Sequence, residues 1–109
     1  MIFRLFSSGK TDEFAKTLAQ GIARRYPPVI ANSPEQMVSH KRVMEILEEA
    51  FARAHQFERE NRLGILGRAK LGHTFKWELK EMGYEGKFVE MATGELAVHL
   101  VRGPKSRIG

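Results

Sequence analysis

The sequence contains no cysteine, which excludes disulfide bonds, thiolate metal ligands and cysteine nucleophiles together. Because cysteine-free chains suit a reducing compartment, we expect a cytoplasmic protein. No run of about eighteen apolar residues occurs, so no transmembrane helix is predicted. Residues 1–6 also lack the length of a signal-peptide core and a small-residue cleavage site.

Residues suited to catalysis or metal binding are equally scarce. Asp12 is the only aspartate, and no paired-carboxylate or Ser/His/Asp arrangement can be picked out. The histidines show no i, i+4 spacing of the kind that places two metal ligands on one helix face; they are His40, His55, His73 and His99. We therefore expect a non-enzymatic protein with no metal and no cofactor.

Positive charge exceeds negative charge, with a formal net charge of +5. Beyond Glu95 the chain has no acidic residue and carries Arg102, Lys105 and Arg107. This balance permits contact with nucleic acid or with acidic partners, although it says nothing about fold. The length of 109 residues predicts one domain over 1–103, followed by a flexible basic tail over 104–109.

Apolar periodicity predicts three main helices, over residues 11–26, 34–61 and 66–82. Thr11 and Ser33 are candidate N-caps of the first two helices, and we expect a break near Ser39-His40 within the second. Between the first two helices, residues 29–31 suggest a short extended piece. Gly83 can take the left-handed conformation that ends the third helix, with Tyr84 then meeting Leu79.

The two ends of the domain are predicted to be strands. Residues 1–6 are rich in strand-forming residues. Two short apolar runs, 88–91 and 96–101, flank a turn-like Ala92-Thr93-Gly94-Glu95, which predicts a β-hairpin over about 87–102. The expected fold class is therefore α+β: an N-terminal strand, three main helices and a C-terminal β-hairpin in one small domain.

The second predicted helix has an unusually wide apolar arc, of roughly 160° at 100° per residue. Such an arc needs more cover than one neighbouring helix gives. Either the helix is central in the monomer, or it also meets a second copy of the chain. In the second case, the homodimer interface would include Val43, Met44, Leu47 and Phe51.

The third predicted helix combines cations with aromatic side chains on the side away from Leu71 and Phe75. These residues are Lys70, His73, Lys76, Trp77 and Lys80, and they could meet phosphates and stack on bases. In element order only, residues 64–102 resemble the second half of a winged helix, in which such a helix enters the major groove of DNA. The alternative is that Trp77 and Leu66 belong to the core and the lysines cover its rim.

Two glycine-containing motifs resemble phosphate-binding loops but lack residues that such loops need. Gly9-Lys10-Thr11 looks like the end of a phosphate-binding loop, but Arg4 stands where that loop requires glycine. Residues 64–67 have the Gly-x-x-Gly pattern of the KH domain, but the intervening Ile-Leu pair does not suit a phosphate clamp.

The sequence thus predicts a small, basic, non-catalytic nucleic-acid-binding protein, for DNA or RNA. Its contact residues would be the five on the helix face, together with Arg102, Lys105 and Arg107. The alternative is a non-catalytic interaction or scaffold protein that forms a homodimer through helix 34–61.

Overall fold

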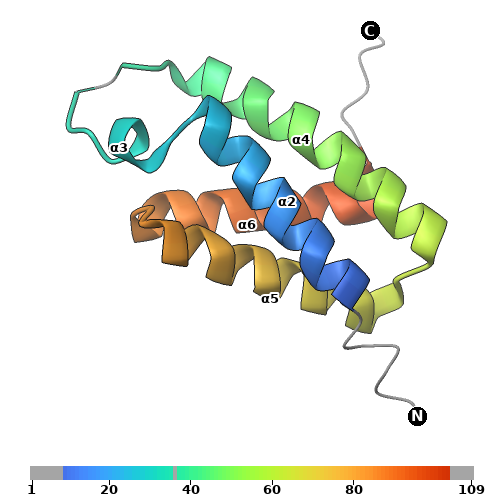
Figure 1. Cartoon of the computed structure of the whole chain (residues 1–109). Helices are drawn as coiled ribbons and strands as arrows, with labels where there is room; N and C mark the ends of the chain where they lie inside the picture. The colour runs from blue at the N-terminus through green and yellow to red at the C-terminus, as the bar shows by residue number, and fades with distance from the viewer. Residues whose placement is uncertain (1–8, 36, 104–109) are drawn as a thin grey trace, which may run out of the picture.

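The computed structural model describes residues 9–35 and 37–103, and within these ranges the chain is entirely helical (Figure 1). Its elements are α2 (Gly9–Arg25), α3 (Pro28–Ala31), α4 (His40–Asn61), α5 (Gly64–Met82) and α6 (Gly86–Arg102). The four long helices form a bundle in which α2 packs on α4 and α5, and α6 packs on the same two helices. The architecture is a four-helix bundle with the single turn α3 at one end.

Contacts between side chains fix the direction of each helix in the bundle. Asp12 near the start of α2 meets Thr74 of α5, and Tyr26 just after α2 meets Tyr84 just after α5, so these two helices run parallel. Lys76 of α5 pairs with Glu90 of α6, which runs in the opposite direction (Figure 1).

The core lies between all four long helices. Its largest fully buried side chains include Phe51 from α4, Phe75 from α5 and Leu96 from α6. The rings of Phe51 and Phe75 meet edge to face, with centroids 5.6 Å apart. Aromatic pairs favour this geometry, so the contact ties the diagonal helices α4 and α5 together.

The predicted C-terminal hairpin is wrong, and so is the α+β fold class that depended on it. Residues 86–102 form one helix, because Val89, Ala92, Leu96 and Leu100 recur at spacings of three and four and are all buried. Apolar residues between these positions made the pattern look like two short strands. The turn-like Gly94 lies exposed inside the helix. The winged-helix resemblance ends with the hairpin.

No strand occurs in the described ranges, and the predicted strand over residues 1–6 lies outside them. The basic tail over 104–109 also lies outside. Among the described residues, none of the helices combines the length and the apolar character that a membrane span requires.

Helix α4 begins later than the sequence suggested. The Ser39 hydroxyl accepts a hydrogen bond from the Arg42 amide at 3.1 Å and caps the helix, so the expected break at Ser39-His40 is in fact its start. Ser33 accepts from the Glu35 amide at 3.2 Å but starts no helix. Thr11 is buried within α2, which begins at Gly9, and is not its N-cap.

The predicted end of α5 is confirmed. Gly83 has φ 99°, and the amide of Tyr84 donates to the Leu79 carbonyl at 3.3 Å. This bond, with that from the Gly83 amide to the Lys80 carbonyl at 3.0 Å, makes a Schellman stop. The glycine allows a tight reversal into α6, which brings α5 and α6 together as antiparallel neighbours.

The segment between α2 and α4 holds this reversal in place. Residues 28–31 form the helical turn α3, so the extended piece predicted over 29–31 is wrong. The Asn32 side-chain amide donates to the Gly83 carbonyl at 2.8 Å, and its oxygen accepts from the Glu85 amide at 3.0 Å. The Tyr84 hydroxyl donates to the Tyr26 carbonyl at 2.7 Å, and burial raises the pKa of Tyr84 to about 12.

Candidate interaction surface on helices α5 and α6

The aromatic and apolar side chains on the outer face of α5 are exposed to solvent. Trp77 is 55% exposed and Leu66 is 62% exposed, so the alternative that placed both in the core is wrong. His73 and Lys80 are exposed on the same face. The opposite face buries Leu71, Phe75 and Leu79, as the spacing of these residues predicted.

The lysines at the two edges of this face are engaged with carboxylates. Lys70 Nζ lies 3.7 Å from Asp12 Oδ1 of α2, and Lys76 Nζ lies 3.2 Å from Glu90 Oε2 of α6. Asp12 also accepts a hydrogen bond from the Thr74 hydroxyl at 3.0 Å. These carboxylates reduce the positive potential that the sequence pattern suggested.

Of the basic residues predicted near the C-terminus, Arg102 does not extend this face. Arg102 is exposed at the C-terminal end of α6. Lys80 lies at the C-terminal end of α5, which is close to the start of α6, so the two residues are at opposite ends of this helix pair. Lys105 and Arg107 lie outside the described residues. The structure therefore gathers His73, Trp77 and Lys80 and leaves Arg102 apart from them.

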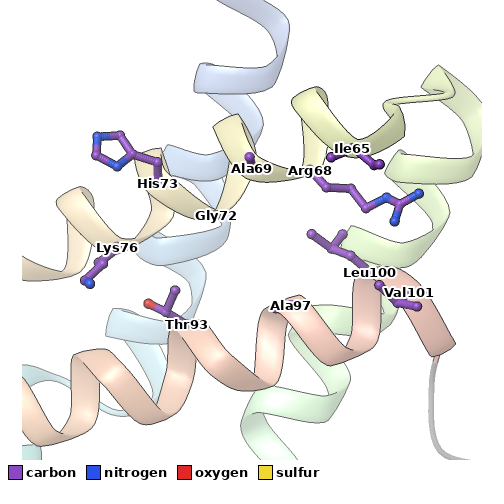
Figure 2. A pocket seen from close by; sticks show the side chains of 10 residues that line it. All are labelled: Ile65, Arg68, Ala69, Gly72, His73, Lys76, Thr93, Ala97, Leu100 and Val101. Carbon is purple, nitrogen blue, oxygen red and sulfur yellow. The ribbon is translucent and has the colours of Figure 1, made fainter.

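A groove of about 390 Å³ lies between α5 and α6 (Figure 2). Its apolar lining comes from Ile65, Ala69 and Gly72 of α5 and from Ala97, Leu100 and Val101 of α6. Arg68, His73, Lys76 and Thr93 complete it. In Figure 2, Ile65, Leu100 and Val101 lie at one end, and Lys76 and Thr93 lie toward the other.

Small residues create this groove. Ala69, Gly72 and Ala97 occupy positions where larger side chains would fill the space between two packed helices. At its open end, Ile65 is 78% exposed and Val101 is 65% exposed. These exposed side chains continue the apolar lining of the groove to the surface, where contiguous apolar area can serve as a contact site.

Two polar atoms at the groove are buried without a hydrogen-bond partner in the described part of the chain. They are Thr93 Oγ1 and Arg68 Nε. Arg68 Nε lies 3.5 Å from Glu58 Oε2, close enough for an ion pair although the geometry of a hydrogen bond is not met. Arg68 is thus neutralised by its own chain, and Thr93 contributes an unsatisfied hydroxyl to the groove wall.

The residues predicted for a homodimer interface lie inside the monomer. Val43, Leu47 and Phe51 are buried in the core, and Met44 packs partly buried against it. The wide arc of α4 is explained by its two neighbours, because α2 covers one part and α6 another. Of the two interpretations of this arc, the central position in the monomer accounts for all four side chains.

The structure offers no metal site among the described residues, in which no cluster of three His, Cys, Asp or Glu side chains occurs. His55 and His99 face backbone carbonyls instead. Nδ1 of His55 lies 3.1 Å from the carbonyl of His99, and Nδ1 of His99 lies 2.9 Å from that of Glu95. A ring nitrogen facing a carbonyl must donate, so the His55 bond joins α4 to α6, whereas the His99 bond lies within α6.

The groove was missed at the sequence level because half of it was assigned to a hairpin. Once 86–102 is helical, Ala97 and Val101 are one turn apart and share a face. They face Ile65 and Ala69 only because of the way α5 packs against α6, and local sequence patterns do not predict that packing. No family model, curated protein or solved structure matches this chain.

Proposed function

We propose that this chain is a non-catalytic protein-interaction domain whose α5–α6 groove binds an amphipathic helix of a partner protein. The observation that carries the proposal is the apolar groove, together with the exposed Ile65 and Val101 at its open end. Covering these side chains would remove apolar surface from water, which is the main driving force of association.

The shape of the groove favours a helix as the occupant. Two antiparallel helices leave a furrow between them that a third helix can enter with the side chains of one face. Because small residues line the middle of the furrow, the partner's backbone could approach closely and place large aliphatic anchors there. Residues at i, i+3, i+4 and i+7 of the partner would supply them.

The charges beside the groove favour acidic residues on the flanks of that helix. His73 and Lys80 form no ion pair within the described residues. Lys76 shares an exposed pair with Glu90, and exposed pairs hold little energy, so its ammonium group can also turn to a partner. The same basic rim would repel its copy, which argues against a homodimer through this face.

A designed peptide tests this proposal. The probe is an amphipathic helix of about five turns with leucine on one face and glutamate on its flanks, and its twin has lysine for glutamate. Calorimetric titration is expected to show binding of the glutamate peptide and about tenfold weaker binding of the lysine peptide.

Variants locate the binding. Ala97→Glu places a charge in the groove at an exposed position and should weaken binding of the glutamate peptide at least about tenfold. Gln20→Glu makes the same charge change at an exposed position of α2 and should leave the affinity unchanged. Absence of binding, or equal affinities of the two variants, would overturn the proposal.

A second candidate is nucleic-acid binding, and the exposed Trp77 favours it. Trp77, His73 and Lys80 share the outer face of α5, where a base could stack on the indole beside a cation. Titration with single-stranded and duplex oligonucleotides at rising salt would test this candidate. A slope that shrinks by about one on Lys80→Gln would support it, and no binding at low salt would end it.

A further inference from the structure

A small cleft lined by three arginines lies between α2 and α4. Arg24 and Arg25 come from the last turn of α2, and Arg53 comes from α4. The cleft has a volume of about 60 Å³, and its lining includes the buried apolar side chains of Ile22 and Ala50. No carboxylate and no histidine occurs among the described residues that line it. The two helices thus place three exposed like charges around one apolar base.

The side chain of Arg24 lies over the cleft. A Cβ atom built on Gly21, which also lines the cleft, would be 3.9 Å from Arg24 Nη2, so the guanidinium group lies back along α2 above this glycine. Thr17, one turn earlier on α2, adds a hydroxyl to the same lining. Hydrogen-bond donors therefore border the cleft from α2, and Arg53 supplies further donors from α4.

Only one of the three guanidinium groups is neutralised within the described part of the chain. Arg25 Nη1 lies 2.7 Å from Glu49 Oε1, and this hydrogen bond, with the charge of Arg25, lowers the pKa of Glu49 below its usual value. Arg24 and Arg53 form no ion pair among the described residues. The cleft and its one carboxylate partner therefore carry an excess of two positive charges.

This excess matches the charge of a phosphate monoester. Such a group carries about −1.5 to −2 charges at pH 7 and has three strong acceptor oxygens. The planar fork of a guanidinium group fits two of these oxygens at once. A single water needs about 10–15 Å³ of cavity, so 60 Å³ admits a group of a few heavy atoms, such as a phosphoryl group.

We propose that the α2–α4 cleft binds the phosphate group of a phosphomonoester, with Arg24 and Arg53 as the main donors and with Thr17 and Arg25 beside them. The rest of the ligand lies outside, because the cleft has room for the head group alone. The α5–α6 groove takes no part in this site, so the inference does not depend on the proposed function.

The probe is phosphoserine with an acetylated amino group and an amidated carboxyl group, in which the phosphate is the sole charged group. At low salt, the amide shifts of Gly21 and Ala50 should change and saturate. Arg53→Gln should weaken binding at least about tenfold, because it removes a charged fork. Arg59→Gln makes the same charge change at another exposed position of α4 and should leave the affinity unchanged. Equal losses in the two variants, or no saturable shift, would overturn the inference.

The charge of the ligand is tested by pH. The second pKa of a phosphomonoester is about 6, so lowering the pH from 7 to 5 should weaken binding by up to about ninefold. Sulfate remains a dianion over this range and should bind equally at both values, because Glu49 stays ionised and no described lining residue is a histidine. Equal losses for both ligands would contradict recognition of a dianion.

An oligonucleotide without terminal phosphates separates this site from a nucleic-acid surface. Its phosphodiesters carry one charge each, so Arg53→Gln and Arg59→Gln should reduce any binding of it alike. Binding of the oligonucleotide that is lost in Arg53→Gln alone, together with no binding of the phosphoserine probe, would overturn the inference in favour of nucleic acid.

Discussion

Replacing Gly94 by alanine should stabilise the protein, and the sign of the effect reports on the structure of residues 86–102. Gly94 lies exposed inside α6, and a Cβ atom built on it would meet nothing within 4 Å. Glycine in a helix interior costs about 0.5–1 kcal/mol relative to alanine. The substitution adds no clash that could offset this gain, so the free energy of unfolding should rise by about 0.5–1 kcal/mol.

A hairpin would give the opposite result. In a turn formed by residues 92–95, the glycine would be the residue that adopts positive φ, and alanine there is strained by about 1–2 kcal/mol. Thermal unfolding followed by circular dichroism separates the two cases. For a domain of this size, a gain of 1 kcal/mol raises Tm by about 4 °C.

Gly83→Ala is the matched control, since it makes the same chemical change at a position where φ is 99°. It should lower the free energy of unfolding by about 1 kcal/mol, because alanine pays for the left-handed conformation that ends α5. If Gly94→Ala destabilised the protein as much as Gly83→Ala does, the assignment of residues 86–102 to one helix would be refuted.

Three further substitutions test the contacts around α6. Asn32→Ala removes the hydrogen bonds to the Gly83 carbonyl and the Glu85 amide. The free energy of unfolding in urea should fall by about 1 kcal/mol, because water replaces part of both exposed bonds. An unchanged free energy of unfolding would mean that these two bonds are dispensable. Thr93→Val removes a buried hydroxyl without a hydrogen-bond partner and should raise the free energy of unfolding by up to about 1 kcal/mol, measured as a higher urea midpoint at constant m. A lower midpoint would show that the hydroxyl is bonded. Burial raises the pKa of Tyr84 to about 12, above its usual value of 10.0, so the stability that the protonated hydroxyl provides is present below pH 10 and is lost as pH rises from 10 through 12. Tyr84→Phe should lose less stability over that interval, and parallel pH profiles would contradict the argument.

Local signals in the sequence predicted the parts of the fold that local contacts determine. The end of α5 follows from Gly83 and its Schellman bonds, which join residues only three and five positions apart. The face of α5 that enters the core was equally readable from Leu71, Phe75 and Leu79. The outward position of Trp77 was one of two interpretations left open, and it depended on which helices cover α5.

The C-terminal helix was missed because its local signals conflict. Val89, Ala92 and Leu96 carry a helical period, but the apolar Val98 and Val101 fall outside it and remain exposed. Packing against α4 and α5 overrides the turn-like residues between them. The groove could not be predicted from the sequence, because it exists only where the small residues of two helices face each other.

The most direct test of the groove is a map of amide chemical shifts during titration with the leucine–glutamate peptide. The proposed function predicts that the largest shifts occur at groove residues such as Ala69, Gly72 and Ala97, while the exposed faces of α2 and α4 stay unchanged. Shifts centred on α4, or no shifts at peptide concentrations that saturate a micromolar site, would contradict it.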